Sequence, residues 1–222
     1  MAALKNSERK KIKLIATKES LKVLKKVDIP VEVVRSVQEE GEKLFKRAGF
    51  TFSRVPQNLI LVTEPTIVLT PGELNIGKNV KMVALDGVTD IHNAAAILRT
   101  AAFYGVNYLI ISQKNSFSIT PSFARASSGG LEFVKIVRTS NLAKTIRFLN
   151  EHGVMTVGFS ESGGESVPRK ADSMCLVLGS EDNGISFAVN RNLSNHFTLK
   201  SRGNISTLNV SVAAAIAMQL HF

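Results

Sequence analysis

Short apolar runs alternate with helix-like segments through the last two thirds of the chain, and this alternation constrains the fold more than any other feature. Expected strands lie at 81–86, 107–112, 133–137, 154–159, 174–179 and 196–200. Expected helices lie at 91–104, 121–128, 141–151, 186–193 and 209–220. Apolar strands that alternate with helices form a parallel sheet with both faces covered. The sequence therefore predicts an α/β fold for this region.

The first 78 residues follow a different pattern and are expected to form a separate, smaller domain. Apolar residues recur every three or four positions in two segments, which predicts two helices. These helices, one strand and a linker rich in Pro and Gly are expected at 7–27, 31–48, 58–63 and 64–80. The predicted domains are residues 1–78 and residues 79–222.

The charge of the chain is concentrated near its N-terminus. The 222 residues carry a formal net charge of +10, and residues 1–26 hold nine Lys and Arg against two Glu. Such density suits phosphate contacts, which need little sequence specificity, and nucleic acid is the expected polyanion. A basic but inert surface is the alternative. The candidate phosphate contacts are Lys10, Lys11, Lys13, Lys22, Lys25 and Lys26.

Other features narrow the chemistry by what they exclude. The single cysteine, Cys175, lies in an apolar run, which predicts a buried thiol and suits a reducing, cytoplasmic location. The apolar stretch near 210–220 is too short to span a bilayer, and the four histidines are scattered, so neither a membrane nor a metal site is expected. GxGxxG, P-loop and GxSxG motifs do not occur, which argues against a dinucleotide site, a Walker-type NTPase and a serine nucleophile.

Two strand–loop–helix units at 176–186 and 199–220 place polar side chains at the carboxyl edge of the predicted sheet, where open α/β sheets bind ligands. The loops carry Glu181, Asn183, Thr207 and Asn209, and their glycines let backbone approach a ligand. A set of this kind suits positioning and hydrogen bonding better than covalent catalysis.

The predicted helix at 91–104 brings two more candidates. Asp90 or His92 can cap it, and Asn93 falls in its first turn. Arg99 follows six residues later, so its side chain points about 120° away from that of Asn93. Asn93 would act at the helix mouth, whereas Arg99 would project into a cleft or a partner. An exposed or salt-bridged helix arginine is the alternative.

At these residues the chain resembles the SpoU/TrmH family of RNA 2′-O-ribose methyltransferases, within the SPOUT superfamily. Three motifs match in order: HNAAAILRTAAFYG (92–105), LVLGSEDNGI (176–185) and ISTLNVSVAAAIA (205–217). The segment SSGGLEFVKI (127–136) is similar to the family's element between the first two motifs. The resemblance covers roughly residues 80–222.

The resemblance implies a parallel-sheet, trefoil-knotted methyltransferase domain, S-adenosylmethionine as the cofactor, and a homodimer whose site takes residues from both chains. It implies that the small basic domain before it binds RNA, and ribosomal RNA is favoured over tRNA because the chain ends directly after the last helix. The implied cofactor contacts are Gly179, Glu181, Gly184, Leu199, Leu208 and Asn209. The implied catalytic residues are Asn93, Arg99, Glu181, Thr207 and Asn209, with Arg99 also facing RNA or the partner's cofactor.

Two departures from the family pattern bear on activity. Threonine stands at 207 where the family has serine, and Leu199-Lys200-Ser201 replaces Ile-Pro-Met. Two alternatives therefore stay open: a non-catalytic RNA-binding or ribosome-assembly protein on the same scaffold, and a base methyltransferase of the same superfamily. Arg99 is a phosphate clamp in our interpretation, and a base only if it is strongly perturbed, because an ordinary guanidinium keeps its proton.

Overall fold

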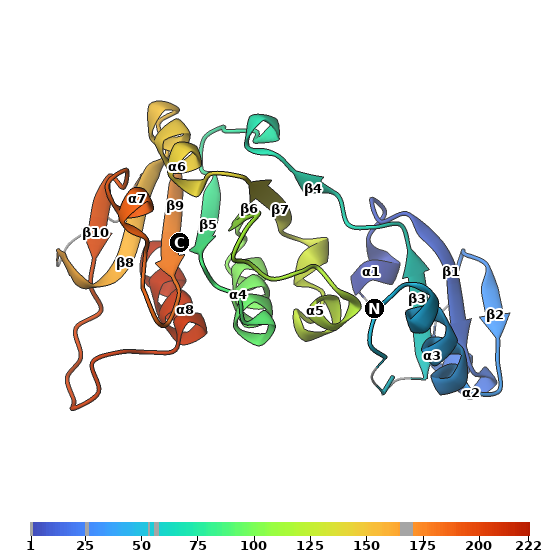
Figure 1. Cartoon of the computed structure of the whole chain (residues 1–222). Coiled ribbons are helices and arrows are strands. Elements are labelled where there is room, and N and C mark those ends of the chain that lie inside the picture. The colour runs from blue at the N-terminus through green and yellow to red at the C-terminus, as the bar shows by residue number, and fades with distance from the viewer. Residues whose placement is uncertain (1, 25–26, 53, 56–57, 165–170) are drawn as a thin grey trace. The chain divides into compact units, whose positions relative to one another are not determined.

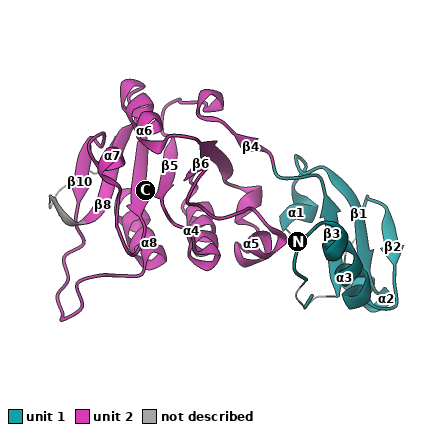
Figure 2. Cartoon of the chain, in the orientation of Figure 1, with its two compact units in different colours: residues 1–66 teal, residues 67–222 magenta. Residues whose placement is uncertain are grey.

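The computed structural model describes residues 2–24, 27–52, 54–55, 58–164 and 171–222. The chain divides into two compact units, residues 1–66 and residues 67–222, coloured separately in Figure 2. Each unit has its own sheet, and each is described by itself below.

The first unit is a three-stranded sheet in the order β2-β1-β3 with short helices between the strands. Strand β1 pairs in parallel with β2 and antiparallel with β3. The elements are α1 (Ala2–Lys5), β1 (Lys11–Ala16), α2 (Lys18–Val23), β2 (Val31–Val33), α3 (Val37–Arg47) and β3 (Leu59–Thr63).

The helix predicted at 7–27 is wrong, because residues 11–16 form the central strand β1 of this sheet. Leu14 and Ile15 lie on this central strand and are fully buried. The pairing with the neighbouring strands outweighs the helical spacing of the apolar residues. The helix α2 starts only after Thr17, whose hydroxyl accepts a hydrogen bond from the Ser20 amide at 3.3 Å. The apolar residues that show helical spacing in the sequence therefore belong to two different elements, β1 and α2.

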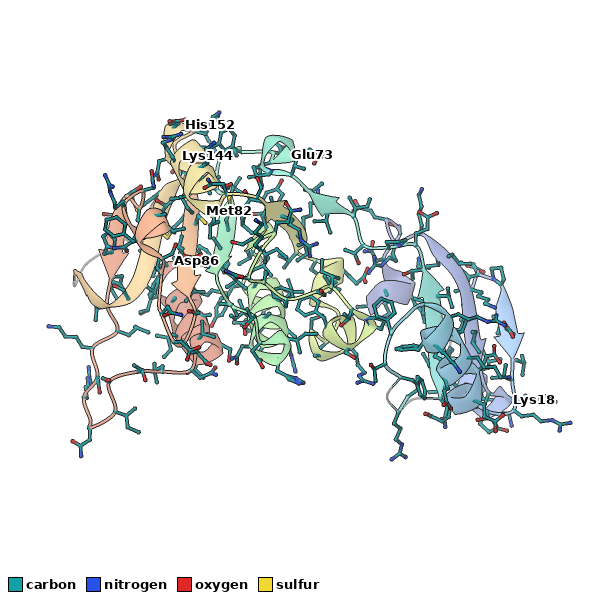
Figure 3. All side chains as sticks on the ribbon, in the orientation of Figure 1. Lys18, Glu73, Met82, Asp86, Lys144 and His152 are labelled. Atoms are coloured by element: carbon teal, nitrogen blue, oxygen red, sulfur yellow. The ribbon has the colours of Figure 1, made fainter. Side chains whose placement is uncertain are left out.

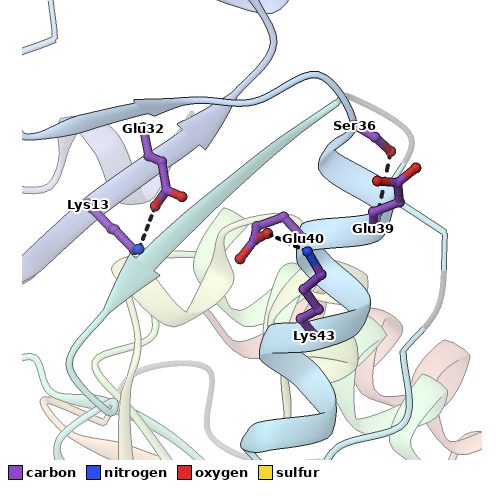
Figure 4. A network of polar contacts seen from close by, with 6 residues as sticks. All are labelled: Lys13, Glu32, Ser36, Glu39, Glu40 and Lys43. Atoms are coloured by element: carbon purple, nitrogen blue, oxygen red, sulfur yellow. Dashed lines mark hydrogen bonds and ion pairs between the residues drawn. The ribbon is translucent and has the colours of Figure 1, made fainter.

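The helix predicted at 31–48 is correct only in its second part, and the strand predicted at 58–63 is confirmed as β3. Residues 31–33 form the edge strand β2, and Ser36 then caps α3 by accepting from the Glu39 amide at 3.3 Å. Figure 4 shows this cap and, beside it, the ion pair between Lys13 of β1 and Glu32 of β2. The sequence after Pro30 therefore turns from strand to helix at a capping serine.

The second unit is a seven-stranded sheet in the order β10-β8-β9-β5-β6-β7-β4, and every neighbouring pair is parallel (Figure 1). This confirms the predicted parallel α/β sheet. The strands are β4 (Val68–Leu69), β5 (Lys81–Asp86), β6 (Tyr108–Ser112), β7 (Lys135–Thr139), β8 (Met155–Gly164), β9 (Met174–Gly179) and β10 (Asn195–Phe197). The helices are η1 (Pro71–Glu73), α4 (Ile91–Phe103), α5 (Pro121–Ala126), η2 (Gly130–Glu132), α6 (Leu142–Glu151), α7 (Phe187–Asn190) and α8 (Val210–His221).

The boundary between the units lies at 66/67 and not at 78/79 as the sequence suggested. The segment interpreted as a linker contains β4, which pairs with β7 and forms one edge of the large sheet. A two-residue strand flanked by Pro65 and Pro71 has no periodicity that a sequence pattern could detect. The hydrogen bonds of this short edge strand assign residues 67–80 to the larger unit.

Helices cover both faces of the large sheet. Helices α4 and α8 pack on one face over Val83, Leu109 and Leu176, and α6 and α7 pack on the other over Met82, Ile110 and Val177. Adjacent strand residues point to opposite faces, so each strand feeds both cores. The strands are therefore apolar throughout, as a doubly covered parallel sheet requires.

Helices α4 and α8 run side by side in the same direction. Alanines of both helices are fully buried at their contact, which allows close approach. At their carboxyl ends the Tyr104 hydroxyl donates to Gln219 at 2.7 Å. The Lys81 ammonium donates to the carbonyls of Tyr104 at 3.1 Å and Phe222 at 2.9 Å, so one cation serves the ends of both helices. No helix in the described part of the chain is long and apolar enough to cross a membrane.

The buried thiol predicted for Cys175 is confirmed, and it offers a test of the fold. Cys175 is fully buried on β9, and burial raises the pKa of its thiol far above the usual range. Since the thiolate is the reactive form, we expect the folded protein to be inert to a thiol reagent such as dithionitrobenzoate at neutral pH.

In guanidinium chloride the same reagent should titrate one thiol per chain, because the sequence has one cysteine. Full reaction of the native protein within the time of the unfolded control would contradict the placement of β9 in the centre of the sheet.

Candidate functional site

The candidate site lies where β5 and β9 end. These strands are neighbours, and their last residues, Asp86 and Gly179, stand opposite each other in the register. Because the strands are parallel, the loops that follow them leave from the same edge of the sheet. One loop leads into α4 and the other into α7.

The loop after β9 is folded back tightly on itself. Ser180 and Gly184 exchange backbone hydrogen bonds of 3.1 and 2.9 Å, and the Asn183 amide donates to the Ser180 hydroxyl at 3.2 Å. A Cβ at Gly179 would lie 2.0 Å from the Gly184 carbonyl carbon. Gly184 itself has a φ of +62°, which side-chain-bearing residues rarely adopt. Both glycines are therefore requirements of this turn.

Asp86, which is not among the residues predicted from the sequence, fixes the far side of this loop. Its carboxylate accepts a hydrogen bond from the Ser186 amide at 2.8 Å, which ties the start of α7 to the end of β5. Figure 3 labels Asp86 at the end of that strand. An acidic residue that closes an otherwise apolar strand was the available signal.

Three of the predicted site residues meet at the amino ends of α4 and α8, and we call them the polar triangle: Asn93, Glu181 and Asn209. The Asn209 amide nitrogen donates to Glu181 Oε1 at 2.7 Å and to Asn93 Oδ1 at 3.0 Å. Asn93 Nδ2 donates to the same Glu181 oxygen at 3.2 Å, and the Val210 backbone amide approaches it at 3.4 Å. One carboxylate oxygen therefore joins the mouths of two helices.

Capping residues hold the triangle in place. Asp90 accepts from the Asn93 backbone amide at 2.7 Å, so Asp90 rather than His92 is the cap of α4. Asn209 caps α8, and its Oδ1 accepts from the Ser211 amide at 3.0 Å and the Ser211 hydroxyl at 2.6 Å. The predicted position of Asn93 at a helix mouth is thus confirmed.

A cavity of about 470 Å³ opens beside the polar triangle, within the usual size range of small-molecule sites. Apolar side chains and polar loop residues both contribute to its walls. It is lined by Phe159, Ser160, Leu178, Gly179, Ser180, Glu181, Asp182, Asn183, Gly184, Ile185, Asn190, Leu199, Ser206, Thr207, Leu208, Val210 and Ala213.

The cavity and the triangle together include most of the predicted residues. Gly179, Glu181, Gly184, Leu199, Thr207 and Leu208 line the cavity, and Asn209 joins it through Glu181. Leu208 is 51% exposed on the loop between β10 and α8. The two predicted strand–loop–helix units therefore do converge on one site.

Arg99 lies apart from this group. Its side chain is exposed on α4, it does not line the cavity, and it makes no hydrogen bond or ion pair with the described residues. The 120° separation from Asn93 that the helix geometry predicts agrees with this position. A free guanidinium near a site is available to an anion that is not part of this chain.

The basic residues that were predicted to contact phosphate differ in whether their side chains already have a partner in the described part of the chain. Lys13 pairs with Glu32 at 2.6 Å, Lys10 pairs with Glu64 at 3.4 Å, and the Lys11 ammonium donates to the Asn6 carbonyl at 2.6 Å. Lys22 is exposed on α2, as is Lys18, which Figure 3 labels. Lys25 and Lys26 lie outside the described residues. In the described ranges, His, Cys, Asp and Glu form no group of three that could hold a metal ion.

The chain belongs to the SpoU rRNA Methylase family, whose sequence pattern matches residues 81–219. A Staphylococcus haemolyticus protein named for the TrmH family of tRNA/rRNA methyltransferases is 37% identical over 139 residues, which cover 62% of this chain and 56% of that protein. A Staphylococcus aureus protein of the same description shows the same identity and coverage. The chain thus matches little more than half the length of these relatives.

Solved structures extend the likeness to the whole chain. A TrmH-family RNA methyltransferase structure from Porphyromonas gingivalis has a TM-score of 0.77 at 26% identity, covering 99% of this chain and 86% of that one. The SpoU methyltransferase AviRb from Streptomyces viridochromogenes, solved in complex with AdoMet, has a TM-score of 0.76 at 18% identity, covering 99% and 84%. The second likeness concerns the fold alone.

The Gly184 backbone lies so close to Gly179 that a single added methyl group should clash with it. Gly179→Ala should destabilise the protein by about 1–3 kcal/mol or displace the 180–184 turn, because its Cβ would overlap backbone that cannot move independently. Urea unfolding followed by circular dichroism measures the change.

Gly72→Ala is the matched control. A Cβ there meets nothing within 4 Å and the backbone has no positive φ, so this variant should unfold within about 0.5 kcal/mol of the wild type. Equal stability of both variants would mean that the turn does not lie against Gly179.

Proposed function

We propose that this chain is an S-adenosylmethionine-dependent RNA methyltransferase that transfers a methyl group to a ribose 2′-hydroxyl. The observation that carries the proposal is the polar triangle of Asn93, Glu181 and Asn209 at the edge of a cavity, formed by the motifs that the family shares. The family membership of residues 81–219 supports the reaction class.

The cavity suits a cofactor with both polar and apolar parts. Gly179, Gly184, Leu199 and Leu208 would contact S-adenosylmethionine largely through backbone. At Gly184 nothing lies within 4 Å of the position that a Cβ would take, so a ligand can approach the backbone there. A bound sulfonium cofactor supplies an already activated methyl group. AdoMet is present in the AviRb structure and in an rRNA methyltransferase structure from Sinorhizobium meliloti (TM-score 0.76, 20% identity), which supports this choice.

Glu181 has one oxygen left for a ligand. Its Oε1 is occupied by the amides of the triangle and of Val210, whereas its Oε2 makes no hydrogen bond with the described residues. That oxygen can accept a hydroxyl of the substrate ribose or of the cofactor. Thr207 also lines the cavity, and its hydroxyl makes no hydrogen bond with the described residues. These groups orient reactants in line, which suits a transfer from an activated donor.

Arg99 would hold the phosphate next to the target ribose. A guanidinium keeps its proton at any physiological pH, so it serves as a fixed cation rather than as a base. Its side chain is exposed and forms no ion pair with a carboxylate in the described part of the chain, so it is available for that contact. Planar donors of this kind bind phosphate in a bidentate manner.

A homodimer is part of the proposal. Helix α8 exposes Val212, Ile216 and Leu220 at four-residue spacing, and α4 exposes Phe103 at 82%. Arg99 precedes Phe103 by one helical turn, on the same flank of α4. In a dimer that buries these side chains, Arg99 would serve the partner's cavity, as the family resemblance implies. The trefoil knot that the resemblance implies, in which the last helix threads a loop, belongs to the same proposal.

Ribosomal RNA is the favoured substrate, with tRNA second. Incubation with radiolabelled S-adenosylmethionine and each RNA, followed by nuclease digestion, locates the methyl group on ribose or base. A methylated base would favour the base methyltransferase. Tight RNA binding without cofactor binding, measured by calorimetry, would favour the non-catalytic scaffold that Thr207 and the 199–201 loop suggest.

Substitutions at the site should distinguish residues that support cofactor binding from residues that contact RNA. Asn209→Ala should weaken S-adenosylmethionine binding and lower methyl transfer at least tenfold, because it removes the shortest hydrogen bond to Glu181 and the bond that orients Asn93, the other side chain that donates to Glu181. Arg99→Ala should lower transfer similarly but leave cofactor affinity in calorimetry unchanged if the guanidinium contacts RNA.

A mixture of the two variants tests the shared site. If Arg99 serves the partner's cavity, mixed dimers of Arg99→Ala and Asn209→Ala regain part of the activity, since one of their two sites is intact. Full activity of both single variants would refute the site assignment, whereas inactive mixtures would refute only the sharing.

The salt dependence of RNA binding should depend on Lys18 and Lys22 of α2, which are exposed and lie within ion-pair distance of no carboxylate among the described residues. Lys18→Gln combined with Lys22→Gln should reduce the slope of log affinity against log salt by roughly 1.4, as expected for two lost contacts to single-stranded RNA. Lys10→Gln with Lys13→Gln is the control, because these lysines already pair with Glu64 and Glu32. An unchanged slope in the first pair would exclude α2 from the RNA surface.

A further inference from the structure

Helix α7 exposes an aromatic side chain at the edge of the cavity. Phe187 is 75% exposed although it is one of the largest apolar residues of the second unit. Val189, two residues later, is 2% exposed and anchors α7 to the sheet. The helix therefore buries one apolar side chain for stability and leaves a larger one in solvent, at a cost of the burial free energy that Phe187 could supply.

The Arg191 side chain places a positive charge beside the ring of Phe187. The Arg191 guanidinium carbon lies 5.5 Å from the ring centroid, within the range of a cation–π contact. The two residues are four apart, so they share one side of the chain at α7. Arg191 is exposed and forms no ion pair with the described residues, so its charge is available to a phosphate.

The segment that carries this pair adjoins the cavity, although neither Phe187 nor Arg191 is itself one of its lining residues. Ile185 and Asn190, which flank Phe187 in the sequence, both line the cavity. The bond from the Ser186 amide to Asp86 holds the start of α7 against the end of β5. Phe187 is thus presented on a short, anchored segment at the rim of the site and not on a loose loop.

This aromatic residue is separate from the apolar surface of α4 and α8. Val189 packs into the core on the α6 side of the sheet, whereas α4 and α8 cover the opposite face. The exposure of Phe187 therefore has a different reason from that of Phe103, Val212 and Ile216.

We infer that Phe187 and Arg191 form a stacking platform for an unpaired base of the RNA that enters the cavity, with Arg191 also facing its phosphate. A ribose can reach a cavity of this kind only where the strand is open, and open bases stack on aromatic rings and guanidinium planes. The net charge of +10 fits a polyanionic partner. The inference rests on the proposed function, because it names how that site would hold its substrate.

The chain has no tryptophan, which allows a direct test that needs no methyl transfer. Phe187→Trp introduces a single indole at an exposed position, and a base that stacks on it quenches its fluorescence. Titration with an oligoadenylate of about ten nucleotides is the probe, since stacking depends little on sequence and this length is typical of single-strand sites. Saturable quenching is expected.

Phe133→Trp is the matched control, since Phe133 is 68% exposed and follows η2, where none of the neighbouring residues lines the cavity, whereas Ile185 and Asn190 on either side of Phe187 both do. Its emission should not change with RNA. Equal quenching of both variants, or no quenching of Phe187→Trp, would overturn the platform. Emission that changes with protein concentration and not with RNA would assign Phe187 to a contact between copies, which also overturns it.

Binding of a fluorescent oligoadenylate completes the test. Phe187→Ala should weaken binding about five- to a hundredfold, and Phe187→Tyr should restore it, because each stacked base contributes on this scale. Affinity for S-adenosylmethionine should be the same in all variants. If the wild type transfers methyl groups but Phe187→Ala binds RNA normally, the stacking platform is refuted and the proposed function stands. If Phe187→Trp is quenched while no RNA is methylated, the proposed function fails and the platform stands.

Discussion

The parallel pairing of β5 with β9 is the contact on which the rest of the larger unit depends. The two strands are far apart in the sequence, and their alignment sets Asp86 opposite Gly179 at one edge of the sheet. From that edge Asp86 reaches the start of α7, and the turn after Gly179 carries Glu181 to the mouths of α4 and α8. A shift of the register by one residue would reverse every side chain of β9 and separate these groups.

The second unit could be predicted well from sequence because its signals are local and strong. Buried parallel strands are apolar along their whole length, and the helices between them carry capping residues such as Asp90 and Asn209. The site residues Asn93, Glu181 and Asn209 were found through their motifs, and the structure adds the bonds that join them. Asp86 was not predicted because its only local signal is an acidic residue at the end of an apolar strand. The hydrogen bond that its carboxylate accepts from a backbone amide a hundred residues later leaves no pattern in the sequence.

The first unit was harder to predict for a physical reason. Its central strand β1 carries lysines at alternate positions and is followed by a helix, so apolar residues of both elements fall at helical spacing. Residues 11–16 form a strand only because β1 pairs with β2 and β3, and a single sequence does not reveal that pairing. The edge strand β4 escaped notice for the same reason, since its identity comes from β7.

The side-by-side arrangement of α4 and α8 has an electrostatic consequence for the site. Two helices that point the same way place their partial positive ends together and their partial negative ends together, which is unfavourable. Lys81 balances the carboxyl ends, and the Glu181 carboxylate balances the amino ends. Glu181 therefore holds the helix pair together whether or not the protein acts on a substrate, and a relative that lost its chemistry would still benefit from keeping it. Thr207, which has no such duty among the described residues, is the more informative position for judging whether a relative is active.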